Sequence, residues 1–380
     1  MDFTFSEEQQ AAAEAARGVF ADVAPDAVPS PALTTGAVAD EFDRALWARL
    51  ADADLLSLLS AEEYGGAGLD AVALCLVLRE SAKVLARVPL LESSAAMAAV
   101  QTYGGPELRA ELLERAGRGE VVLTVAASGR TGHDPAELAV TARQEEGEGA
   151  DWILDGVQTA VPWAYDADYV VVPAHTAADR TVLALVPRAH DGVALGEQFS
   201  TSGERLGELR LESARIAARD VIDVEGAWEW LRDLLTTGTC ALALGLGERV
   251  LRMSSEYTSK REQFGFPVAT FQAVAVQAAD RYIDLRAMEV TLWQAAWRIG
   301  AGAGDTLPVA GDVAVAKIWA SEGVRRVVQT AQHLHGGFGA DVDYPLHRYH
   351  AWAKHLELSL GPAAAHEEAL GDLLAAHSLG

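Results

Sequence analysis

Cysteine is scarce in this chain: among 380 residues there are only two, Cys75 and Cys240, and both lie in apolar segments. Two isolated cysteines exclude a disulfide framework and a zinc site built on cysteine ligands. Positive charge is also in short supply, because 30 Lys and Arg residues stand against 55 Asp and Glu residues, for a formal net charge of −25. A surface of that average charge repels nucleic acids and anionic membranes. Any anionic ligand must therefore be held by a local basic or helix-terminal site.

Long hydrophobic runs are absent as well. No segment approaches the ~18 consecutive apolar residues that a membrane span needs, and the acidic N-terminus, MDFTFSEEQQ, lacks the apolar core of a signal peptide. We therefore expect a soluble, cytoplasmic protein with no membrane span and no nucleic-acid partner. Half of the residues are nevertheless hydrophobic, which is enough for a sizeable core, and the length predicts two or three domains.

The periodicity of the sequence changes twice along the chain. Residues 1–120 have helical periodicity, with a capping-box pattern at Ser6 and Gln9 and a Gly-rich turn, EEYGGAGLD, at 62–70. Residues 121–223 favour an antiparallel barrel or sandwich, because they hold six short β-rich runs, at 121–127, 138–143, 151–156, 169–175, 181–187 and 208–216. Residues 224–380 are helical again.

The last region predicts a bundle of long helices. Its clearest signal is an amphipathic helix at 271–299, followed by a helix that Asp312 caps and by a last helical region at 345–378. The predicted fold class is therefore α+β, with three domains in order: an N-terminal α-helical domain at 1–120, a middle β-barrel domain at 121–223 and a C-terminal four-helix bundle domain at 224–380.

Two segments hold residues suited to binding an anion. In the first, REQFG places Arg261 in a short stretch between two long helices, and in the second, His335-Gly336-Gly337 ends a helix with little side-chain bulk. A guanidinium and exposed backbone amides can together hold a pyrophosphate. From the residues alone, a charged connection between helices is the alternative interpretation. Five histidines fall within 333–355, but they lack metal-ligand spacing, so no metal site is predicted.

The same two segments resemble the C-terminal domain of the acyl-CoA dehydrogenase family, with its R-x-x-F-G, F-Q and H-G-G-x-G signatures, and EEYGGAGLD resembles part of that family's N-terminal domain. Domain order and length are similar over essentially the whole chain. The resemblance implies a flavoenzyme fold of helical domain, β-barrel and four-helix bundle, assembled as a tetramer. It also implies α,β-dehydrogenation of an acyl-CoA, in which a glutamate abstracts the α-proton and the β-hydrogen passes as hydride to FAD.

By this resemblance, one group of residues is expected to complete the FAD site of a neighbouring subunit. Arg261 matches the arginine that contacts the FAD pyrophosphate, and His333 stands where a glutamine is usual. The expected cofactor-binding residues are Arg261, Gln263, Phe264, Val268, Phe271, Gln272, His333, Gly336 and Gly337.

The family's catalytic glutamate is missing from both places where members carry it. Proton abstraction needs a carboxylate against the substrate α-carbon, but Leu360 stands at the usual position and Leu235 at the alternative one. Glu357 and Asp233 are nearby acids, which are either a displaced base or solvated carboxylates on helix faces. We therefore predict no catalytic residue in this chain.

The β-domain departs from the family as well. Members carry an acidic Thr-Glu-Pro, a Gly-Ser-rich loop and a Trp-Ile-Thr-like segment against the flavin ring, where this chain has TVAASGRTGHDP (124–135) and VQTAVPWAYDAD (157–168). Trp163 is present, but its neighbours do not fit the flavin-ring pattern. The chain thus keeps the half-site for a neighbour's FAD and lacks both the base and its own flavin cradle.

This combination resembles the non-catalytic subunit of actinobacterial heterotetrameric (α2β2) acyl-CoA dehydrogenases that act on steroid-CoA side chains. It implies a homologous partner subunit that carries the catalytic glutamate and holds the acyl-CoA substrate. Two alternatives stay open: a homotetrameric dehydrogenase with Glu357 or Asp233 as base, and a scaffold protein of this fold that binds no flavin.

Overall fold

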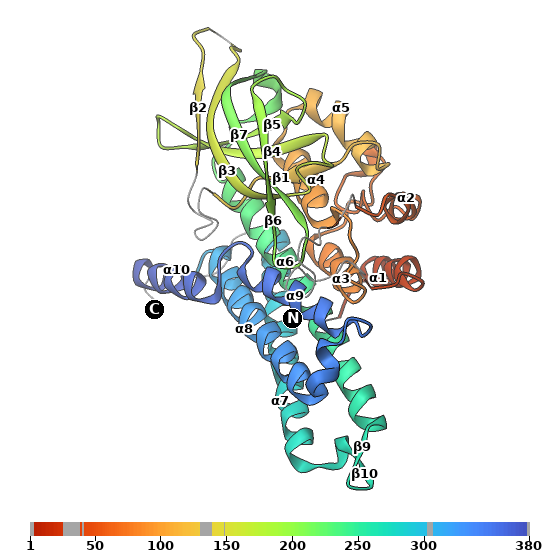
Figure 1. Cartoon of the computed structure of the whole chain (residues 1–380). Coiled ribbons are helices and arrows are strands. Elements are labelled where there is room, and N and C mark those ends of the chain that lie inside the picture. Colours follow the sequence, from red (N-terminus) through yellow and green to blue (C-terminus); the bar gives the residue numbers. More distant parts are fainter. Residues whose placement is uncertain are drawn as a thin grey trace.

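The computed structural model describes residues 4–25, 39, 42–129, 139–147, 149–301 and 307–377. Helices, a β-sheet and a second set of helices follow one another along the chain, as predicted. In Figure 1 the sheet lies at one end of the molecule, with the N-terminal helices beside it, and the long C-terminal helices extend toward the other end. The predicted fold class is confirmed, while the domain boundaries at 120/121 and 223/224 stay a prediction.

The N-terminal region is built from short helices. They are α1 (Glu7–Phe20), α2 (Arg44–Asp52), the 3₁₀ turn η1 (Glu62–Tyr64), α3 (Ala71–Ala82), α4 (Leu90–Tyr103) and α5 (Pro106–Gly117). The capping box is confirmed, because the Gln9 amide donates to Ser6 Oγ at 3.2 Å and the Ser6 amide donates to Gln9 Oε1 at 2.9 Å. The segment at 62–70 is the predicted turn, and its Gly65 and Gly68 both have positive φ.

The middle region holds one eight-stranded sheet in the order β6-β7-β3-β2-β4-β5-β8, with β1 paired to β4. Its strands are β1 (Leu123–Val125), β2 (Val140–Gln144), β3 (Trp152–Pro162), β4 (Tyr169–Thr176), β5 (Thr181–Pro187), β6 (Val193–Phe199), β7 (Arg205–Ile216) and β8 (Val221–Ile222). The sheet is mixed, so the antiparallel expectation is wrong at two pairs: β1 and β2 both run parallel to β4. The reason is that β3 turns back to pair with β2 and β7, so that β4 joins the other edge of β2 in the same direction.

The C-terminal region is dominated by three long helices, α6 (Ala227–Lys260), α7 (Gln272–Ala301) and α8 (Val309–His335). The short strands β9 (Glu262–Gln263) and β10 (Phe266–Pro267) and the 3₁₀ turn η3 (Val268–Thr270) join α6 to α7. After α8 come the 3₁₀ turn η4 (Gly336–Ala340), α9 (Leu346–Leu358) and α10 (Ala363–Ala376). The predicted helix at 271–299 is therefore confirmed, and the last helical region is two helices separated by a short turn.

The prediction that Asp312 caps a helix is wrong. Helix α8 begins at Val309, directly after Pro308, and its N-terminus has no side-chain cap. A proline restricts the backbone before it and supplies no amide donor, which favours a helix start at this point. Asp312 lies in the first turn, and its Oδ2 is 3.4 Å from Nε of Arg298 on α7.

Helix α6 runs through the centre of the protein and packs against α3, α4, α7, α8 and α9. Among the described residues it is the one helix long and apolar enough to cross a membrane by length and composition, and 78% of its apolar window is buried inside the protein. That burial identifies it as a core helix. Cys240 of α6 and Cys75 of α3 are both buried and unbonded.

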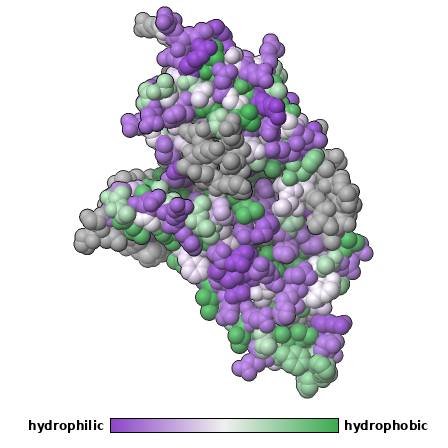
Figure 2. Space-filling view, turned by 60° about the vertical axis from the view of Figure 1, so that its left-hand side comes forward, coloured by the Kyte–Doolittle hydropathy of each residue, from purple (hydrophilic) through white to green (hydrophobic). Residues whose placement is uncertain are grey.

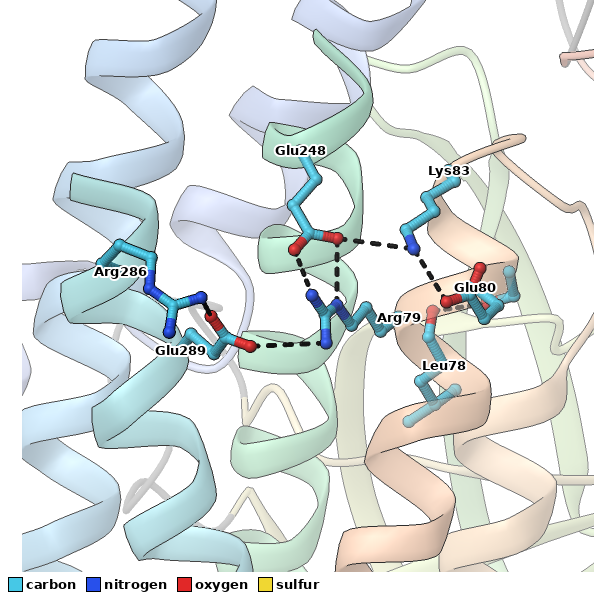
Figure 3. A network of polar contacts seen from close by, with 8 residues as sticks. Leu78, Arg79, Glu80, Lys83, Glu248, Arg286 and Glu289 are labelled. Carbon is cyan, nitrogen blue, oxygen red and sulfur yellow. Dashed lines mark hydrogen bonds and ion pairs between the residues drawn. The ribbon is translucent and has the colours of Figure 1, made fainter. Parts of the chain in front are cut away.

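Close backbone contact and a network of ion pairs join α3 to the long helices. A Cβ at Gly245 of α6 would lie 2.0 Å from the carbonyl oxygen of Arg79, so the two helices can approach this closely only because Gly245 has no side chain. Arg79 donates to both carboxylate oxygens of Glu248 on α6 and lies 3.5 Å from Glu289 on α7. Lys83 bridges Glu80 and Glu248 in the same network (Figure 3). These contacts hold α3 against α6 and α7.

Candidate cofactor-binding hairpin and central cavity

Arg261 lies at the base of a β-hairpin that projects from the end of the molecule away from the sheet (Figure 1). Strands β9 and β10 pair antiparallel, with Phe266 opposite Gln263. The two turn residues, Phe264 and Gly265, have φ of 54° and 80°, as two-residue hairpin turns require. The amide of Val268 donates to the carbonyl oxygen of Arg261 at 2.7 Å and closes the base of the hairpin. The short loop between the long helices is thus an ordered element.

This hairpin exposes large apolar side chains to solvent. Phe264 is 89% exposed and Phe266 is 62% exposed, and the Phe264 and Phe271 rings pack edge to face with centroids 6.4 Å apart. Figure 2 shows hydrophobic residues gathered at this lower end of the molecule. Exposed aromatic side chains at a projecting tip are typical of an interaction surface. Arg261, Gln263 and Gln272 are also exposed, and Val268 is half-buried.

The second predicted motif lies beside the hairpin. Tyr257, one helical turn before Arg261, stacks on His335 with ring centroids 4.4 Å apart and on Phe338 at 5.4 Å. The structure therefore brings the Arg261 hairpin and the Gly336-Gly337 turn to the same end of the molecule. His333, in the last turn of α8, is exposed.

The residues at this end fit a pyrophosphate. A Cβ at Gly336 or Gly337 would meet nothing within 4 Å, so their backbone is open to close approach, and Gly336 has a positive φ of 59°. Within the described ranges no ion pair involves Arg261, so its charge is available to an anion. The Gly336 amide donates to the carbonyl oxygens of Gln332 and His333, so the fit depends on the Arg261 guanidinium and on backbone that a phosphate can approach closely. That these nine residues bind FAD stays a prediction.

A cavity of about 370 Å³ lies at the junction of the three regions. Its walls come from α3, the first turn of α4, the strands β1 and β3, the turn between β6 and β7, one face of α6, and α9 with the turn that follows it. Leu235 on α6 and Leu360 after α9, the two leucines predicted to replace the catalytic glutamate, both line this cavity.

The two nearby acids do not face the cavity. Neither Glu357 nor Asp233 is among the residues that line it. The carboxylate of Glu357 instead accepts from Lys354 Nζ at 2.6 Å. Burial raises the pKa of Asp233 to about 6, but Asp233 lies two residues before Leu235 on α6, and two residues of an α-helix at this spacing face roughly opposite sides. The geometry thus gives neither acid access to a substrate in this cavity.

The cavity does contain a carboxyl group that sequence reasoning missed, Glu92 in the first turn of α4. Burial raises its pKa to about 7, although a hydrogen bond from Trp163 acts in the opposite direction. The available signal was a single acid inside the apolar run LLESSAAMAAV. Among the residues that the structure describes, no cluster of three or more His, Cys, Asp or Glu side chains could hold a metal ion.

Comparisons with known proteins agree over the whole chain. Residues 6–120 match the acyl-CoA dehydrogenase N-terminal domain and residues 236–374 match the acyl-CoA dehydrogenase C-terminal domain. The chain is 37% identical to the acyl-CoA dehydrogenase FadE27 of Mycobacterium tuberculosis, covering 99% of both chains. It superposes on a chain of the ChsE4-ChsE5 complex from Mycobacterium tuberculosis with a TM-score of 0.88 and 36% identity, covering 99% of both chains.

A second solved relative is a variant of the Tcur3481-Tcur3483 steroid ACAD, with a TM-score of 0.87, 36% identity, and coverage of 97% of this chain and 98% of that one. FAD is the cofactor of such proteins, so the cofactor prediction is confirmed for the family. The chain therefore belongs to the acyl-CoA dehydrogenase family.

Proposed function

We propose that this chain is the non-catalytic subunit of a heteromeric FAD-dependent acyl-CoA dehydrogenase, and that it completes the FAD site of a partner subunit. One observation carries the proposal: both positions for the catalytic glutamate are leucines that line the cavity, Leu235 and Leu360, while the Arg261 hairpin is intact and exposed. A homomeric enzyme would need a catalytic glutamate and the cofactor-binding hairpin in the same chain.

In this proposal the chain's residues bind and orient the cofactor. Arg261 neutralises part of the pyrophosphate charge, and the glycine backbone at Gly336 and Gly337 lets the phosphate oxygens approach closely because no side chain stands in the way. The exposed rings of Phe264 and Phe271 exclude water from the joint between the subunits. Bound FAD supplies the acceptor for the hydride that leaves the substrate β-carbon, and the partner's glutamate takes the α-proton.

Two relatives support the heteromeric assembly and the substrate class. One is a chain of a two-component complex, ChsE4-ChsE5, and the other is a steroid ACAD, each at 36% identity. We infer an α2β2 assembly with a homologous partner, acting on the CoA thioester of a steroid side chain held at the partner's site. A cytoplasmic location stays a prediction from the sequence.

The test is the flavin content of the chain purified alone and after co-expression with a homologous acyl-CoA dehydrogenase subunit that carries the glutamate. We expect a colourless chain alone, and about one FAD per heterodimer with steroid-CoA dehydrogenase activity in the complex. Four FAD per α2β2 complex would contradict the half-site. Turnover by the chain alone would establish the homotetramer, and a flavin-free complex would establish the scaffold.

A further inference from the structure

The central cavity is well formed, although the proposed function does not use it. Its volume of about 370 Å³ falls within the range of small-molecule sites, about 300–1,000 Å³. Phe199 and Leu358 line it and are 49% and 46% exposed, so they mark its mouth. A space of this size with an opening to solvent can admit a ligand.

Strained backbone surrounds this cavity. Four non-glycine residues that line it have positive φ: Leu85 at 49°, Ala160 at 51°, Trp163 at 55° and Leu360 at 56°. Side chains other than glycine rarely adopt this conformation, and it persists where the surrounding structure enforces it, most often at functional sites. The positive φ values at four wall positions therefore support a functional role for this cavity.

The charges around the cavity argue against an anionic ligand. Arg205 lines it, but its guanidinium pairs with Glu197 at 2.8 Å and lies over the Tyr165 ring. Burial lowers the pKa of His355 to about 4, so this imidazole is neutral at pH 7. In the part of the wall that the structure describes, a phosphate or carboxylate would therefore find no cation that is not already paired.

Glu92 provides a hydrogen-bonding group of a different kind. Its carboxyl lines the cavity, accepts a hydrogen bond from Trp163, and takes part in no ion pair between described residues. Because burial raises its pKa to about 7, the protonated form is well populated at neutral pH, and a protonated carboxyl can donate a hydrogen bond. The remaining wall is mostly apolar, including Leu242 and Leu246 on the α6 face.

We propose that this cavity binds an uncharged, largely apolar small molecule whose carbonyl or hydroxyl oxygen accepts a hydrogen bond from Glu92. The apolar body of the ligand lies against the leucine side chains of α6 and extends toward the mouth at Phe199 and Leu358. This binding site belongs to the chain itself and is separate from the exposed hairpin. It therefore holds whether or not the hairpin completes a partner's FAD site.

The experiment uses prodan, an uncharged fluorescent naphthyl ketone, with the anionic dye anilinonaphthalene sulfonate for comparison. Titration into the full chain, alone or with its co-expressed partner, should give saturable prodan binding at one site per chain. The anionic dye should bind at least about tenfold more weakly. Equal or tighter binding of the anionic dye would overturn the assignment.

Variants locate the site. Glu92→Ala should weaken prodan binding about tenfold through loss of the hydrogen bond, whereas Glu92→Gln keeps a donor and should stay within about threefold. Glu107→Ala is the matched control, because Glu107 also lies in the first helical turn, of α5, but is exposed. It should leave the affinity unchanged.

A second variant tests the space rather than the hydrogen bond. Ala86 lines the cavity and is half-buried, so Ala86→Phe, or Ala86→Leu if the larger ring prevents folding, should block prodan. Binding that survives this change lies elsewhere and overturns the proposal. FAD per heterodimer, measured in the same preparations, should not respond to any of these variants, which separates this test from that of the half-site.

Discussion

Leu235 of α6 and Leu360 of the turn after α9 line the same cavity, although they lie in different helical segments of the bundle. By the sequence resemblance, each stands where the catalytic glutamate is expected in the family. The wall of the cavity is therefore apolar at both places, which supports the proposal that this chain supplies no base.

Restoring a carboxylate at Leu360 should not restore an enzyme. Leu360→Glu places an acid in the cavity wall, but in the proposed function this chain holds no flavin ring of its own. We expect no acyl-CoA dehydrogenation by the variant alone, and a loss of about 1 kcal/mol in the free energy of unfolding, because Leu360 is half-buried and its carboxylate replacement is partly desolvated. Dye-reduction assays and denaturant titrations measure the two effects. Turnover by the variant alone would contradict the missing flavin cradle.

Arg261→Ala should lower the affinity of the heteromeric complex for FAD. A charge-assisted contact is worth about 1.5–3 kcal/mol, which corresponds to roughly 10- to 150-fold in the dissociation constant. Arg252→Ala is the control, because Arg252 is also an exposed arginine, on α6, and is 4.0 Å from Glu256. Flavin fluorescence after dilution gives the FAD dissociation constants of the complexes that carry Arg261→Ala and Arg252→Ala. Equal FAD retention in the two variants would remove Arg261 from the site.

Local patterns predicted much of the fold because they depend on neighbouring residues. The capping box at Ser6 and Gln9 is formed, the EEYGGAGLD turn is formed, and the three-four spacing at 271–299 became α7. The predicted strand runs all became strands, since alternation and β-branched residues reflect local burial. The REQFG motif predicted a short connection between two long helices, but not that β9 and β10 pair in it as a hairpin.

Features that depend on contacts distant in sequence escaped prediction. Strand alternation does not reveal that β2 and β4 pair in parallel, because this depends on where β3 turns back. Aspartate is a common helix-capping residue, but α8 begins three residues before Asp312, at Val309, directly after Pro308. The cavity and the raised pKa of Glu92 arise only where α3, α4, α6 and β3 pack together. The sequence of any one of these elements does not reveal that packing.

Gly245→Ala should separate α3 from α6. The new Cβ would lie 2.0 Å from the Arg79 carbonyl oxygen, a backbone atom that cannot rotate away. Overpacking of this kind costs about 1–3 kcal/mol or more in the free energy of unfolding. Gly371→Ala, in α10 with nothing within 4 Å of the new Cβ, should instead stabilise the protein by about 0.5–1 kcal/mol through helix propensity. Urea titrations of the two variants give the change in the free energy of unfolding, which should be a loss for Gly245→Ala and a gain for Gly371→Ala. Stabilisation by Gly245→Ala would refute the close contact.

Glu92 should make stability depend on pH between about 4.5 and 7. Its pKa is about 7 in the folded protein against 4.5 for an ordinary glutamate, so the native state binds more protons than the unfolded chain in this window. The stabilisation that the protonated Glu92 carboxyl gives to the folded protein is therefore fully present below pH 4.5. It is lost as the pH rises through 7, which lowers the free energy of unfolding by up to about 3 kcal/mol. The unfolding free energy of wild type, minus that of Glu92→Gln, should fall across this window and then level off. A difference that is flat with pH would show that the carboxyl is solvated. Glu107→Gln should keep the wild-type slope.

Lys317 of α8 should hold the end of α9 in place. Its buried Nζ donates to Ser321 Oγ at 2.9 Å, to the Leu356 carbonyl at 2.9 Å and to the Glu357 carbonyl at 3.2 Å. Lys317→Met leaves these carbonyls of the last helical turn without their donor, which should cost about 1–3 kcal/mol in the free energy of unfolding at pH 7. Lys354→Met removes a lysine from α9 whose side chain is 44% exposed and paired with Glu357, and should cost less than about 1 kcal/mol.

The pH dependence gives the Lys317 contact a second signature. Burial lowers the pKa of Lys317 to about 8, from 10.5, so between these values the unfolded chain keeps a proton that the native state has released. Wild type therefore gains stability from this group as the pH rises from about 8 to 10.5, and Lys317→Met cannot. Burial raises the thiol pKa of Cys75 and Cys240, which opposes this gain, but both thiols are present in wild type and variant alike. The stability difference between the two proteins should thus widen from pH 8 to pH 10, and a difference that narrows would mean that the ammonium is not buried.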